Sequence, residues 1–120
     1  MEIGDINGFS DKLSVSYTSL TNINYTNIIS GVALANINST ISDIRNVNRV
    51  AFNYKINNFQ IASNGVESAI DTSGTLPEFS AFSIGNDVFA ENDSNCMYGH
   101  IRSLEYYSPM ETNIGDLTTW

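Results

Sequence analysis

Oxygen-bearing side chains gather in one stretch of the chain, "NDVFAENDSN" at residues 86–95. Asp87, Glu91, Asp93 and Asn95 offer the carboxylate and amide oxygens that Ca²⁺ prefers. Their spacing is not that of an EF-hand loop, which requires acids at fixed alternate positions and a glycine at the sixth. The stretch is therefore either a Ca²⁺ site with these four ligands or an ordinary solvated loop.

Sugar binding is the second chemistry that the residue types allow. A sugar presents apolar C–H faces and polar edges, so its site needs an exposed aromatic ring beside hydrogen-bonding groups. His100 and Arg102 have structural alternatives: His100 can orient a loop, and Arg102 can pair with an acid across a strand. The predicted ligand-binding residues are Tyr98, His100, Arg102, Tyr107, Phe89 and Asn92.

Catalytic chemistry finds little support in the sequence. Glycoside hydrolysis uses two acids about 5–10 Å apart, at least one with a raised pKa, but none of the 13 acids sits inside an otherwise apolar strand. Cys96 is the single cysteine, so an intrachain disulfide is excluded. The single histidine, His100, lies four residues from it without a third group to orient the pair. We therefore expect no enzymatic activity.

Composition predicts an all-β domain with few charges. Charged residues make up 15% of the 120-residue chain, against roughly 25% in typical soluble domains. Asn and Ser disfavour helices, whereas Ile, Val, Tyr, Phe and Thr suit strands. The net charge of −8 disfavours nucleic acid, whose affinity rests on Lys and Arg. The sequence contains no apolar run of about 20 residues that could span a bilayer.

Hydrophobic alternation predicts the strands that must position these residues. "RVAFNYKI" (49–56) places Val50, Phe52, Tyr54 and Ile56 on one face. Asn57-Asn58 and Asn64-Gly65 are expected as tight turns, and Phe59 and Ile61 between them as inward-facing residues. A three-stranded antiparallel meander is therefore expected over residues 49–70.

Further strands are expected on both sides of this meander. "KLSVSYTS" (12–19) places Leu13, Val15 and Tyr17 on one face, and "NIISGVALANI" (27–37) is interpreted as one buried strand. Downstream, 71–79 is expected to be a loop and "SAFSIG" (80–85) a short strand with Phe82 and Ile84 inward.

The last expected strand, "YGHIRSLEYY" (98–107), slips by one residue in its inward face between Ile101 and Leu104, as a β-bulge would produce. Tyr106 and Tyr107 then have opposite parity, so one is expected in the core and the other outside. Short strands at this spacing predict an antiparallel β-sandwich or jelly roll in a single domain, residues 1–120, of which 1–10 is a linker or an incomplete N-terminal strand.

The order of these motifs resembles a known family. "NRVAFNYKINNFQIASNG", then "LPEF", "FSIG" and "YGHIRSLEYY" are similar to the C-terminal laminin-G-like, concanavalin-A-like module of bacteriophage tail and tail-fibre proteins. The matching positions are Arg49 to Phe52, Tyr54, Asn64-Gly65, Leu76-Pro77, Ile84-Gly85, Gly99 to Arg102, Leu104 and Tyr106-Tyr107.

This resemblance implies a non-enzymatic virion module, located in the phage tail and extracellular when it functions. Its expected partners are host cell-surface polysaccharide and other virion proteins, without nucleic acid or membrane insertion, and the family setting implies a homotrimer. No cofactor is expected, apart from the Ca²⁺ considered above. Two alternatives stay open: a purely structural virion protein that packs against subunits without binding glycan, and an accessory domain of a depolymerase.

Overall fold

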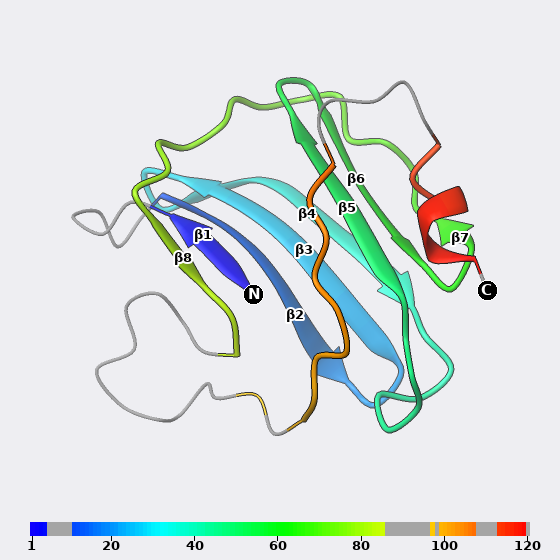
Figure 1. Ribbon diagram of the computed structural model, residues 1–120. Helices are drawn as coiled ribbons and strands as arrows, with labels where there is room; N and C mark the ends of the chain where they lie inside the picture. The colour runs from blue at the N-terminus through cyan, green and yellow to red at the C-terminus, as the bar shows by residue number, and fades with distance from the viewer. Residues whose placement is uncertain (5–10, 86–96, 98, 108–112, 120) are drawn as a thin grey trace.

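The structure is a computed structural model of the chain, and it describes residues 1–4, 11–85, 97, 99–107 and 113–119. This part of the chain is built from antiparallel strands and one short 3-10 helix, as the composition predicts (Figure 1). One sheet has five strands in the order β4-β3-β2-β1-β8, and the other has three in the order β5-β6-β7. The elements are β1 (Glu2–Gly4), β2 (Lys12–Ser19), β3 (Asn22–Ile29), β4 (Val32–Thr40), β5 (Val50–Lys55), β6 (Asn58–Ser63), β7 (Val66–Glu67), β8 (Ala81–Ser83) and the 3-10 helix η2 (Asp116–Thr118).

The expected meander over residues 49–70 is confirmed as β5, β6 and β7. Asn64 and Gly65 form the second turn with φ of 50° and 84°, which Asn and Gly tolerate best. The first turn lies one residue earlier than predicted, at Ile56-Asn57, because Asn58 already pairs with Lys55. Asn57, with a φ of 56°, is the residue that makes this turn possible.

The prediction of one strand over residues 27–37 is wrong. Ser30 and Gly31 have φ of 51° and 75°, and they form a two-residue turn between β3 and β4, where Ile29 pairs with Val32. Positive φ at both turn residues matches the right-handed twist of a hairpin. The Ser30 N–H is also held by the Asp11 carboxylate at 2.6 Å.

The two sheets share one hydrophobic core. Its buried members come from β2, β3, β4 and β6 and from the residue after β4. The Tyr25 hydroxyl crosses from β3 to donate a hydrogen bond to the Asn53 carbonyl of β5 at 2.9 Å, and the Ser39 and Ser63 hydroxyls join β4 to β6 at 2.5 Å. Full burial of one large apolar side chain contributes about 1.5–3 kcal/mol, so this cluster holds the layers together: Leu13, Ile23, Tyr25, Ala35, Ile41, Phe59 and Ile61.

The C-terminal residues 113–119 are hydrogen-bonded to the β6–β7 turn and its flanking strand. The Thr118 hydroxyl accepts a hydrogen bond from the Gly65 N–H at 2.7 Å and donates one to the Gly115 carbonyl at 2.8 Å. The Gly115 N–H donates to the Glu67 carboxylate at 2.6 Å. Thr118 is fully buried, so these bonds tie residues 113–119 to the three-stranded sheet without water competing for the hydroxyl.

Two predictions for the C-terminal half of the chain are wrong: the strand over residues 98–107, and the inward position of Phe82 and Ile84. Residues 101–107 form no strand, so the predicted bulge is wrong, and Tyr106 and Tyr107 are both exposed. The short strand β8 is present, but Phe82 and Ile84 are 52% and 40% exposed. Through the β1 register, Phe82 lines up with the core residue Leu13 and faces the same side of the sheet. In the described part of the chain the second sheet packs on β3 and β4, whereas β8 lies at the opposite edge of the five-stranded sheet, so Phe82 stays exposed.

Candidate functional site

Most of the residues predicted to carry function lie outside the described part of the chain. This holds for the whole Ca²⁺ set and for three of the sugar-binding residues, so the structure tests neither prediction there. The residues concerned are Asp87, Glu91, Asp93, Asn95, Tyr98, Phe89 and Asn92, and Cys96 lies outside it as well.

The other three predicted ligand-binding residues lie on one exposed segment, residues 99–107. His100 and Arg102 are exposed, and no strand forms there against which Arg102 could face an acid. The Tyr107 hydroxyl donates a hydrogen bond to the Glu105 carboxylate. This bond, followed by the negative charge of Glu105, raises the pKa of Tyr107. The segment therefore presents a cation, an imidazole, a carboxylate and rings to solvent.

Residue Tyr106 of this segment joins an exposed aromatic cluster, defined here as Tyr54, Phe79 and Tyr106. The rings of Tyr54 and Phe79 meet edge to face, with centroids 5.9 Å apart and planes at 87°. Burial, then a hydrogen bond with the Tyr106 side chain, raises the pKa of Tyr54. Phe79 is 41% exposed and Tyr106 76% exposed, so the cluster offers ring surface and phenol hydroxyls together.

Strand β5, the loop before β8 and the segment 99–107 each contribute one ring to this cluster. Phe52 connects it to the core, because its ring centroid lies 6.3 Å from that of Tyr54 and 5.5 Å from that of Tyr25. Sequence reasoning missed Phe79 and assigned Tyr54 wholly to the core. Alternation correctly gives the face on which Tyr54 lies, but it carries no signal of how much the opposite sheet covers.

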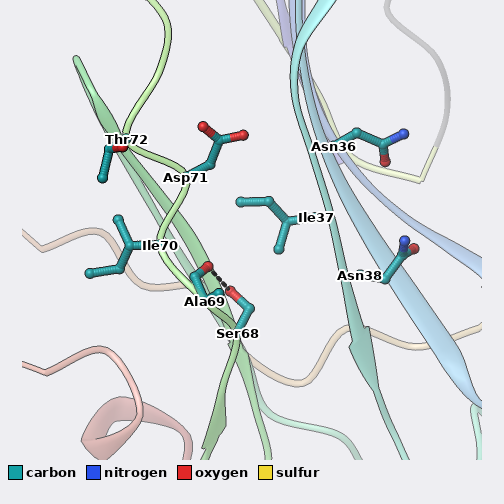
Figure 2. Close-up of a pocket in the computed structure, with 8 residues that line it drawn as sticks. All are labelled: Asn36, Ile37, Asn38, Ser68, Ala69, Ile70, Asp71 and Thr72. Atoms are coloured by element: carbon teal, nitrogen blue, oxygen red, sulfur yellow. Dashed lines mark hydrogen bonds between the residues drawn. The ribbon is translucent and has the colours of Figure 1, made fainter.

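The outward side of β2, β3 and β4 is a second distinctive surface, called here the polar face. Strand register places short uncharged polar residues in rows across the three strands. The alternation is visible for β4 in Figure 2, where Asn36 and Asn38 point away from the side on which Ile37 lies. The rows are Ser14–Thr26–Asn36, Ser16–Asn24–Asn38 and Ser19–Asn22–Thr40.

Hydrogen bonds fix the side chains of the polar face. The Asn24 amide nitrogen donates to the side-chain oxygens of Asn36 at 2.7 Å and Asn38 at 3.0 Å. The Ser14 and Thr26 hydroxyls lie 2.7 Å apart. Because Asn24 binds the side-chain oxygens of Asn36 and Asn38, the amide nitrogens of these two residues point away from Asn24 and can donate hydrogen bonds to another group.

A solvent-open hollow of about 480 Å³ lies between β4 and the segment 68–72 (Figure 2). That segment continues β7 along β6, since the Ser68 N–H donates to the Ile61 carbonyl and Asp71 and Phe59 exchange backbone bonds. Ile37 points from β4 toward Ile70 and Asp71 across the hollow. The hollow thus separates the outer strands of the two sheets.

Two further features are absent from the described ranges: a cluster of side chains that could bind a metal ion and a membrane-spanning helix. Among those residues, no group of three or more His, Cys, Asp or Glu side chains could hold a metal ion. No helix of the described part is long and apolar enough to cross a membrane.

Comparison with known proteins identifies no relative. The chain matches no protein-family model, no curated protein sequence and no solved structure.

Proposed function

We propose that this chain is a non-enzymatic phage virion module of the tail or tail fibre that attaches to host-surface glycans. The proposed fold is a β-sandwich of jelly-roll type, concanavalin-A-like or laminin-G-like. The two antiparallel sheets around one core support the fold. The order of motifs from Arg49 to Tyr107 supports the family.

The observation that carries the glycan proposal is the exposed aromatic cluster. The contacting rings of Tyr54 and Phe79 present apolar area to the C–H face of a sugar. The hydroxyls of Tyr54 and Tyr106 bond each other and keep further donor and acceptor positions for its polar edge. His100, Arg102 and Tyr107 are neighbours along the chain and would add polar contacts. Single sugar contacts of this kind are weak, and a multivalent virion would raise the effective affinity without any new contact.

The main alternative is a structural virion protein that packs against other subunits. It is favoured by apolar side chains that the second sheet leaves uncovered, notably Phe82 and Ile84 at β8. Exposed apolar surface of this kind often marks protein contacts. The Ca²⁺ site remains part of the proposal because the acidic stretch suggests it. The homotrimer rests on the family resemblance alone, and it is the alternative to the dimer proposed below.

An oligosaccharide array separates the two functions. We expect the folded chain to bind a defined class of sugars saturably, and loss of binding in chelator would assign Ca²⁺ a role. Absence of binding to every sugar by folded protein would refute the glycan proposal. The structural alternative would then be tested by mixing the chain with purified tail proteins.

A further inference from the structure

Strand β4 is an exposed sheet edge of unusual character. It contains nine residues, "VALANINST", with neither a charge nor a proline. Natural edge strands avoid pairing with other chains by being very short or by carrying charges and prolines. Strand β8 is protected by its length of three residues, β7 and its continuation carry Glu67 and Asp71, and β5 ends on Lys55.

Strand β4 pairs with another strand on one side only, and at its end the Thr40 carbonyl also accepts a hydrogen bond from the Ser63 hydroxyl at 3.2 Å. The partner strand is β3, and within the described ranges no backbone bond joins β4 to another segment on its opposite side. The hollow of Figure 2 opens beside this free side at Asn36, Ile37 and Asn38. Ala69 and Ile70, both exposed, form part of its other wall. A strand added at this edge would therefore meet backbone N–H and C=O groups of β4 that pair with no other strand, next to the apolar side chains of the hollow.

The residues around Ile37 are self-complementary. An antiparallel pairing centred on Ile37 sets Ile37 opposite its own copy and Asn36 opposite Asn38 of the second chain. Directly opposed residues of an antiparallel pair point to the same face. The two isoleucines would lie on the side of the hollows, and the four amides of the two Asn36–Asn38 pairs would lie on the polar face.

We propose that β4 is a dimer interface, on which β4 of a second copy of this chain pairs antiparallel about Ile37. The five-stranded sheet continues through the two-fold axis, and the amide contacts of Asn24 with Asn36 and Asn38 extend into the second chain. A net charge of −8 opposes self-association in general, and β4 adds no like-charge contact to that repulsion because it carries no charged residue. Asp71 is the one charged residue in the described wall of the hollow, and its carboxylate already accepts bonds from the Ser73 N–H and hydroxyl.

The test is the mass of the purified chain in solution by sedimentation equilibrium over a range of protein concentrations. We expect a reversible equilibrium between 13.2 kDa and twice that mass. Asn38→Lys places a charge on the edge and should weaken the dimer at least tenfold. Ser16→Lys is the matched control, because it adds the same charge to the same row on a central strand, and it should dimerise as the wild type does.

Asn36→Lys serves as a second edge variant should Asn38→Lys fail to fold, which circular dichroism reports. A wild-type chain that stays monomeric at every concentration, or that forms a closed trimer, would overturn the proposal. A dimer that both folded edge variants keep at full strength would overturn it as well. The result is independent of glycan binding, so it separates this interface from the proposed function.

Discussion

Replacement of Thr118 by valine tests whether the C-terminal residues stabilise the fold. Valine has nearly the same shape but no hydroxyl, so the Gly65 N–H loses the acceptor that it has at 2.7 Å. The Gly115 carbonyl keeps a partner, because it also accepts the Thr118 N–H at 2.9 Å. One orphaned donor at a turn that water partly reaches should cost about 1–2 kcal/mol.

This loss is large enough to measure by thermal and urea unfolding. For a domain of this size the midpoint should fall by roughly 4–8 °C. Thr119→Val is the matched control: its hydroxyl bonds the Asp116 carbonyl at 3.0 Å but is exposed, so the change should stay below about 0.5 kcal/mol. Equal effects of the two substitutions, or no effect of Thr118→Val, would refute the role given to the buried hydroxyl.

Three further predictions follow from turns and titrating groups. Gly65→Ala should destabilise the chain by about 1 kcal/mol in urea unfolding because φ is 84° there; an unchanged midpoint would contradict the turn geometry. Burial, then the charge of Tyr54, raises the pKa of Tyr25, so the contribution of this group to stability is complete below about pH 10 and is lost as pH rises further. Tyr25→Phe should lessen that alkaline loss in the free energy of unfolding measured against pH. Identical pH profiles for the wild type and Tyr25→Phe would contradict the raised pKa. Hydrogen bonds from Arg45 lower the pKa of Asp43 from 3.8 to about 2, so the contribution of the Asp43 carboxylate to stability is lost as pH falls through about 2. In a carboxyl NMR titration, Arg45→Gln should return the pKa of Asp43 toward 3.8. An unchanged pKa of Asp43 in this variant would contradict the Asp43–Arg45 interaction.

Local signals in the sequence predicted the middle of the fold well. In β5 to β7, alternation and Asn-Gly chemistry agree, and both depend on residues close together in the chain. The Ser30-Gly31 turn was missed because apolar residues continue on both sides of it. A Gly preceded by a small polar residue in the middle of that run was the signal that could have found it.

Contacts between distant segments could not be predicted in the same way. The exposure of Phe82 depends on which strands the second sheet covers, and no nearby residue encodes this. The segment 99–107 has a strand-like pattern, but a strand also needs a backbone partner. For the candidate site, the sequence prediction included Tyr107 but not its neighbour Tyr106, and the contact of Tyr54 with Phe79 arises only from folding.

The central claim, that the aromatic cluster binds sugar, is tested most directly by titrating one sugar of the class found on the array into three proteins. The wild type and Tyr17→Ala, which removes a half-exposed tyrosine that is not part of the aromatic cluster, should bind with the same affinity. Tyr106→Ala should bind about tenfold more weakly, the factor that corresponds to a loss of about 1.4 kcal/mol. Equal binding by folded Tyr106→Ala and the wild type would contradict the claim.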